Sequence, residues 1–168
     1  MMRRRGWRWH LIWFFWVSLA VWVAERVEGR TGADVLVVLP QQFLPTNGAV
    51  HYSIGGGGLG LLCTVQHAAY FVAPVPLPTG VRIQRMEAVF DDSAEDAFGV
   101  VTLWRIGERV RDLLALTPVS LARPLREISA VDLAEPEIVR RDFQYWLHLT
   151  LTGPDVCLRA VRVHYAQD

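Results

Sequence analysis

Residues 143–165, FQYWLHLTLTGPDVCLRAVRVHY, carry the strongest secondary-structure pattern in the chain. The first ten of these residues alternate strictly between two classes. The apolar positions are Phe143, Tyr145, Leu147, Leu149 and Leu151, and the mostly polar positions are Gln144, Trp146, His148, Thr150 and Thr152. A period of two residues is typical of a β-strand with one buried face. The sequence therefore predicts a strand over residues 143–152 whose apolar face points into a core.

The second half of this stretch, residues 156–165, alternates again after the turn segment 153–155 (GPD). Folding the two halves back on each other predicts an antiparallel hairpin with Leu151 opposite Cys157. This register places Cys157 on the core face, because side chains of one parity share one side of a sheet. Arg159 is the misfit on that face, and we expect its aliphatic stem to carry the guanidinium to the sheet edge.

Working outward from the hairpin, short apolar runs separated by Gly and Pro predict further strands. They cover residues 35–39, 70–73, 83–90 and 98–106. Many short strands with Gly- and Pro-rich turns are typical of an all-β sandwich or barrel. We predict one antiparallel β-sandwich domain of jelly-roll type over residues 34–168. Residues 107–142 are ambiguous: 108–116 fits a short amphipathic helix, and 128–133 fits another strand.

The N-terminal residues differ from the rest in composition. Residues 1–10 hold four arginines and no acid, and residues 11–24 contain only Ser18 as a polar residue. A basic segment followed by a short apolar one predicts a signal peptide over residues 1–24, or else an N-terminal anchor with a leader helix. Residues 25–33 are expected to form a spacer. The protein is therefore expected to be exported, to the extracellular space or the cell surface.

The charge pattern excludes several classes of function. The chain has 17 basic and 17 acidic residues, and residues 25–168 carry 13 arginines and all 17 acids, a net charge of −4. A nucleic-acid partner is not expected, because phosphate neutralisation needs an excess of basic residues. All 17 basic residues are arginine, which excludes Schiff-base chemistry and a P-loop lysine. Membrane contact is expected only through an uncleaved leader.

Three stretches together resemble a known group of proteins. Residues 70–80 (YFVAPVPLPTG) match a strand followed by an Ala-Pro, any, any, Leu-Pro, any, Gly turn. The acidic segment 91–93 (DDS) follows the next strand, and 161–165 (VRVHY) closes the chain. This order is similar to a broad, largely uncharacterised group of exported bacterial β-sandwich proteins over residues 61–106 and 136–166. The resemblance implies a jelly-roll-like domain and brings no catalytic residues with it.

Cys63 and Cys157 are the only two cysteines. In an exported protein an even number of cysteines favours a disulfide, and the alternative is two buried free thiols.

Four carboxylates lie close together in the segment 91–96 (DDSAED): Asp91, Asp92, Glu95 and Asp96. Oxygen ligands in a loop suit Ca²⁺, so they are candidate calcium ligands. The spacing does not match an EF-hand, and a solvated turn is the simpler interpretation. No other cofactor is expected.

Trp146, His148 and Thr150 share the polar parity of the strand over residues 143–152. An exposed aromatic ring beside polar side chains suits stacking on a sugar ring. One tryptophan supports such a site only weakly. The favoured interpretation is therefore that this face packs against the other layer of the sandwich. No GxSxG or HExxH motif is present, and the Gly-rich segment 55–60 lacks the lysine of a phosphate-binding loop.

The sequence therefore favours an exported, non-enzymatic β-sandwich with a structural or self-assembly role at the cell surface or in an extracellular assembly. Its partners would be copies of itself or other surface proteins, and residues 33–40 would add to a neighbour's sheet edge. The alternative is a carbohydrate-binding module, calcium-dependent if segment 91–96 binds the ion. An enzyme using Glu87 with Asp91 or Asp92 ranks last, because no spacing selects these carboxylates.

Overall fold

The computed structural model describes residues 33–55, 60–65, 67–122 and 127–167. The predicted leader, the spacer apart from Ala33, and the centre of the Gly-rich segment lie outside the described residues. The strands are β1 (Asp34–Val38), β2 (Leu44–Pro45), β3 (Tyr52–Gly55), β4 (Leu61–Thr64), β5 (Ala69–Pro74), β6 (Arg82–Asp92), β7 (Gly99–Ile106), β8 (Arg111–Leu116), β9 (Glu127–Ile138), β10 (Gln144–Leu151) and β11 (Val156–Ala166). A short 3-10 helix, η1, spans Pro40–Gln42. None of the described residues forms a helix long and apolar enough to cross a membrane.

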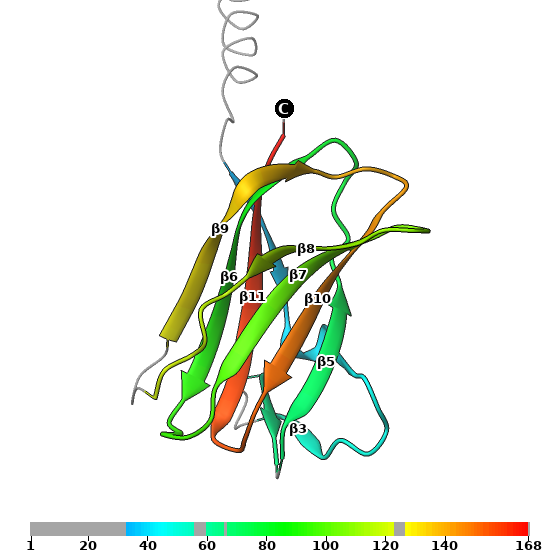
Figure 1. The fold of residues 1–168 in the computed structure, drawn as a ribbon. Coiled ribbons are helices and arrows are strands. Elements are labelled where there is room, and N and C mark those ends of the chain that lie inside the picture. The colour runs from blue at the N-terminus through cyan, green and yellow to red at the C-terminus, as the bar shows by residue number, and fades with distance from the viewer. Residues whose placement is uncertain (1–32, 56–59, 66, 123–126, 168) are drawn as a thin grey trace, which may run out of the picture. The chain divides into compact units, whose positions relative to one another are not determined.

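The strands of residues 33–167 form two antiparallel sheets that face each other (Figure 1). Sheet A has the order β3-β4-β11-β6-β9, and β1 pairs with the far end of β11. Sheet B has the order β2-β5-β10-β7-β8. The described chain is thus an antiparallel β-sandwich of jelly-roll type, as predicted.

Alternate side chains of β10 and β11 meet between the two sheets and form the centre of the core. Leu147 and Leu149 on β10, and Leu158 and Val163 on β11, are at most 1% exposed and belong to one apolar cluster. Burying such a side chain contributes about 1.5–3 kcal/mol relative to leaving it in water. The central strand of each sheet is therefore fixed by the side chains that alternate in the sequence.

The predicted hairpin between these two strands is wrong. Strand β10 pairs with β5 and β7 in sheet B, whereas β11 pairs with β1, β4 and β6 in sheet A. The turn segment 153–155 carries the chain from one layer to the other, with Asp155 at a φ of 64°. Alternation shows which side chains are buried, but it is the same for strands that pair and for strands that face each other across a core.

The structure also corrects the predicted side of Cys157. A β-bulge between Leu158 and Ala160 inserts one residue and reverses the parity of β11. Leu158 before the bulge and Val161 after it therefore both point inward, while Cys157 and Arg159 point to the outer face of sheet A. Arg159 is no misfit, because its Nε donates a hydrogen bond of 2.5 Å to Oδ1 of Asp91.

The ambiguous region is more regular than expected. Residues 111–116 form strand β8 beside β7, not a helix, because their backbone groups complete the edge of sheet B. Strand β9 extends well beyond the predicted 128–133 and contains Pro136. β9 pairs with β6 on one side only, and proline is tolerated in such an edge strand because no neighbour needs its missing N–H.

The predicted disulfide is present. Cys63 on β4 and Cys157 on β11 are directly paired in the register of sheet A, and their sulfurs are bonded. The bond joins positions 94 residues apart, so it ties the β3–β4 hairpin to the strand at the centre of the sheet.

We expect removal of this bond by the double variant Cys63→Ser, Cys157→Ser to lower the free energy of unfolding by about 2–5 kcal/mol, since it releases a long closed loop in the unfolded chain. Urea unfolding with and without reductant measures the effect. The reduced native protein should match the double variant, and the variant itself should not respond to reductant. Equal stability of oxidised and reduced protein would contradict the prediction.

Candidate functional site

The outer side of sheet B carries an aromatic surface, which we call the tryptophan face. It consists of Tyr70, Val72, Pro74, Val100, Thr102, Trp104, Trp146, His148 and Thr150, which alternate with buried residues along β5, β7 and β10. The three sequence candidates Trp146, His148 and Thr150 therefore lie together on the outer surface. The competing interpretation, packing against the other layer, is wrong, because that layer meets Leu147, Leu149 and Leu151 instead.

Two tryptophans lie side by side at the centre of this face. Trp146 on β10 is the direct register partner of Trp104 on β7, and both are partly exposed. Paired side chains on adjacent antiparallel strands have Cβ atoms only about 4.5–5.5 Å apart. The Nε1 of Trp104 donates to Oγ1 of Thr102 at 2.8 Å, and the Nε1 of Trp146 donates to Oε1 of Gln144 at 3.2 Å. Each indole is thus oriented by a hydrogen bond to the side chain two residues earlier on its own strand.

A histidine and an arginine border Trp104. The His148 ring lies 5.8 Å from the indole, centroid to centroid, with an angle of 41° between their planes. The guanidinium carbon of Arg111 on β8 lies 4.9 Å from the Trp104 ring centroid, within cation–π distance. Burial, and then the positive charge of Arg111, lower the pKa of His148 below its usual value. His148 is therefore neutral at pH 7 and offers one hydrogen-bond donor and one acceptor.

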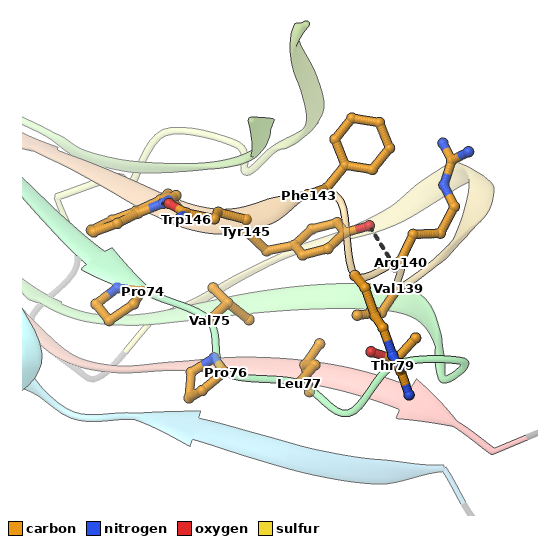
Figure 2. Close-up of a pocket in the computed structure, with 12 residues that line it drawn as sticks. Pro74, Val75, Pro76, Leu77, Thr79, Val139, Arg140, Phe143, Tyr145 and Trp146 are labelled. Carbon is orange, nitrogen blue, oxygen red and sulfur yellow. Dashed lines mark hydrogen bonds between the residues drawn. The ribbon is translucent and has the colours of Figure 1, made fainter. Parts of the chain in front are cut away.

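An open cavity of about 500 Å³ adjoins the tryptophan face. Figure 2 shows Trp146 among its lining residues, with the segment 74–77 (PVPL) on one side and Phe143 and Tyr145 on the other. The remaining lining residues are Thr79, Val139, Arg140, Arg141 and Gln144. Trp146 belongs both to the face and to the cavity, so a bound chain molecule would pass from one to the other without a break.

Tyr145 lines the cavity, and hydrogen bonds fix its hydroxyl. Its hydroxyl donates to Oε1 of Glu137 on β9 at 2.8 Å, and it accepts the backbone N–H of Arg140 at 3.4 Å (Figure 2). Burial and the hydrogen bond to Glu137 raise the pKa of Tyr145 to about 12. Arg105 on β7 donates from Nη1 to both oxygens of Glu137, at 3.1 and 3.0 Å. This network joins the two sheets at the end where the cavity opens.

The four candidate calcium ligands are not brought together. Asp91 points to the outer face of sheet A, where Arg159 binds both its oxygens. Asp92 points the other way, is 2% exposed, and accepts hydrogen bonds from the hydroxyl of Ser120 and the backbone N–H of Ala94. Glu95 and Asp96 are exposed in the following loop. Within the described residues, no group of three or more His, Cys, Asp or Glu is placed to hold a metal ion.

The carboxylate considered for an enzyme, Glu87, lies beside two arginines and a histidine. Arg85 donates to it at 3.1 Å, and the side chains of Arg162 and His164 each approach it to 3.5 Å. Burial raises the pKa of Glu87, but the hydrogen bond from Arg85 and the charge of His164 outweigh that effect and lower it overall. A depressed pKa suits a permanent ion-pair partner better than a general acid.

Sequence reasoning missed Trp104, Arg111 and every cavity residue except Trp146 as site residues. Trp104 alternates with the buried Val101 and Leu103 in the predicted strand over residues 98–106. The sequence pattern could therefore have predicted that its side chain points outward. Its place next to Trp146 was not readable, because that depends on β7 and β10 being neighbours. The cavity is lined largely by the segments 75–79 and 139–143, which lie between strands and for which alternation gives no information.

No protein-family model matches the chain, and no curated protein matches it. Solved structures do. A family 6 carbohydrate-binding module studied for its binding sub-sites is 6% identical, with a TM-score of 0.53, over 79% of this chain and 94% of that one. The module CsCBM6-3 from Clostridium stercorarium, solved in complex with cellobiose, is 9% identical, with a TM-score of 0.52 and the same coverage. At such identities the likeness shows the shared β-sandwich fold.

The environment of His148 can be tested by NMR titration of its imidazole C–H signals. We expect a pKa below the usual 6.5, and we expect Arg111→Gln to move it back toward that value because the repelling charge is gone. The matched variant Arg109→Gln, which removes an exposed arginine of the β7–β8 turn outside the tryptophan face, should leave the titration unchanged. If the pKa of His148 is the same in Arg111→Gln as in the native protein, the two side chains are not close enough to interact.

The role of Asp92 can be separated from ion binding by stability measurements. We expect Asp92→Ala to lower the free energy of unfolding by about 1–3 kcal/mol, because it leaves Ser120 and the N–H of Ala94 without their acceptor. The matched variant Asp96→Ala, at an exposed position, should stay within about 0.5 kcal/mol of the native value. Urea unfolding in calcium and in EDTA checks both. A calcium-induced gain in stability, lost in both variants, would support the calcium site instead.

Proposed function

We propose that this protein is a non-enzymatic carbohydrate-binding domain that holds a polysaccharide against the tryptophan face and acts outside the cell. The observation that carries the proposal is the Trp104–Trp146 register pair. Sugar rings present flat arrays of C–H groups, which pack against aromatic faces, and two adjacent indoles offer room for consecutive units of a chain.

The polar groups of the face fit the same ligand. His148 lies opposite Thr102 in the register, and Thr150 follows His148 on β10. The Thr102 hydroxyl already accepts from Nε1 of Trp104 and donates to the carbonyl of His148, so His148 and Thr150 are the groups offered to a ligand. Hydroxyl and neutral imidazole groups both donate and accept hydrogen bonds, as sugar hydroxyls require. A mainly apolar surface with a few well-placed polar groups is typical of small-molecule and sugar sites. The likeness to a module that was solved with cellobiose supports the proposal through the shared fold.

Export is part of the proposal. The disulfide between Cys63 and Cys157 fits an oxidising compartment, where such bonds persist. A polysaccharide ligand outside the cell would place the protein at the surface or in the extracellular space.

The self-assembly hypothesis has one observation in its favour. Val35 and Val37 on β1 are 43% and 44% exposed, as expected for a strand that meets a partner. However, β1 already pairs with β11 of its own molecule along Asp34–Val38. Addition of this segment to a neighbour's sheet would have to use its other edge or break this pairing, so we rank it second.

Binding of the chain to a panel of soluble and insoluble polysaccharides, measured by affinity electrophoresis and by depletion, tests the proposal. We expect Trp104→Ala and Trp146→Ala each to weaken binding by about 2 kcal/mol, or roughly 30-fold, as for central aromatic contacts in interfaces. Their unfolding midpoints should stay close to the native value, because both indoles lie outside the core.

The matched control is Ile128→Ala, which removes an exposed apolar side chain from sheet A. It should bind as the native protein does. The proposal fails if no polysaccharide in the panel binds, or if binding is insensitive to both tryptophans.

A further inference from the structure

The cavity beside Trp146 has a charge of its own that the proposed function does not use. We infer that it takes an acidic sugar, in which a carboxylate or sulfate group of the bound polysaccharide is held by Arg140 and Arg141. This inference rests on the proposed function and names the class of its ligand.

The lining of the cavity is cationic. It includes the two exposed residues Arg140 and Arg141 and no aspartate or glutamate. Among the described residues, neither arginine forms an ion pair. The nearby Arg105 differs, because Asp112 and Glu137 both bind it and neutralise its charge. The positive charge that lines the cavity therefore comes from two arginines that form no ion pair with any described carboxylate.

Phe143 positions one of these charges. The guanidinium carbon of Arg140 lies 4.6 Å from the Phe143 ring centroid, and that of Arg105 lies 4.9 Å from the same ring. A stacked guanidinium keeps the hydrogen-bond donors at its rim free, and this planar fork matches a carboxylate or sulfate with two parallel bonds. Arg140 is thus arranged to bind an anion while its guanidinium carbon stays over an aromatic ring.

The rest of the cavity suits a sugar ring better than a small free anion. Pro74, Pro76 and Leu77 form an apolar side, and Figure 2 places Trp146 and Arg140 toward opposite ends with Tyr145 between them. A sugar unit stacked on Trp146 can therefore be followed by a unit whose acidic group reaches Arg140. An inorganic anion would leave the apolar side and the indole without contacts.

General electrostatic attraction does not account for such binding. Residues 25–168 carry a net charge of −4, and the full chain has 17 basic and 17 acidic residues, so neither attracts a polyanion through its net charge. Preference for an acidic polymer would have to arise locally, at the cavity. The preference for an acidic polymer should therefore depend on Arg140 and Arg141 and not on arginines elsewhere in the chain.

The test compares polymers that share a backbone and differ in charge. The probes are polygalacturonate against its methyl-esterified form, and dextran sulfate against dextran, with binding measured by calorimetry on the full chain. We expect the acidic member of at least one pair to bind roughly ten-fold tighter or more than its neutral partner, as charged hydrogen bonds provide. The pair that shows the preference identifies carboxylate or sulfate as the recognised group.

The variants separate the cavity from the tryptophan face. Arg140→Ala with Arg141→Ala should abolish the preference, so that the acidic and the neutral polymer bind with equal affinity. Arg140→Lys with Arg141→Lys should retain part of the preference. The control Arg109→Ala, at an exposed arginine that does not line the cavity, should retain all of it. Unfolding midpoints establish that each variant is folded.

The two hypotheses fail in different ways. Equal binding of acidic and neutral polymers that still depends on Trp104 and Trp146 would overturn the acidic-sugar inference and leave the proposed function intact. A preference that is lost equally in Arg109→Ala would also overturn the inference, because it would reflect diffuse charge. Absence of any tryptophan-dependent binding would overturn both.

Discussion

The burial of alternate side chains from β10 and β11 in one core is the constraint on which the rest of the sandwich depends. Leu147 and Leu149 enter that core from sheet B, and Leu158 and Val163 enter it from sheet A. Once these residues are inside, the residues between them must point outward. The outward position of Trp146 and His148 is therefore a direct consequence of core packing and needs no contact of its own.

The two outer faces that result are chemically different. Sheet A presents ion pairs, including Arg159 with Asp91 and the positive groups around Glu87, together with the disulfide. Its charged side chains are largely satisfied by one another. Sheet B presents two indoles, one of which carries the guanidinium of Arg111 over its ring. The candidate site lies on sheet B because the two exposed indoles are on that layer.

The cavity depends on a polar connection between the layers. Arg105 and Tyr145 belong to sheet B, and both bind Glu137 of sheet A. Because all three groups are largely withdrawn from water and Glu137 accepts hydrogen bonds from both Arg105 and Tyr145, the connection fixes the sheets at this end more specifically than apolar packing does. It sets the position of the segment 139–143, which brings Arg140 over Phe143 and beside the cavity.

Most of the strands and the buried parity of residues 143–152 could be predicted from local alternation, and the even number of cysteines favoured a disulfide over two free thiols. None of these predictions requires knowledge of which strands are neighbours. The structure was needed to show that Cys63 and Cys157 are bonded, that β10 and β11 lie in different layers, that the bulge after Leu158 turns Cys157 outward, and that Trp104 lies beside Trp146. Such pairings join positions far apart in the chain, and alternation is identical for every partner that buries the same face. The strand pattern therefore specifies a sandwich, while the site on its surface depends on which strands become neighbours.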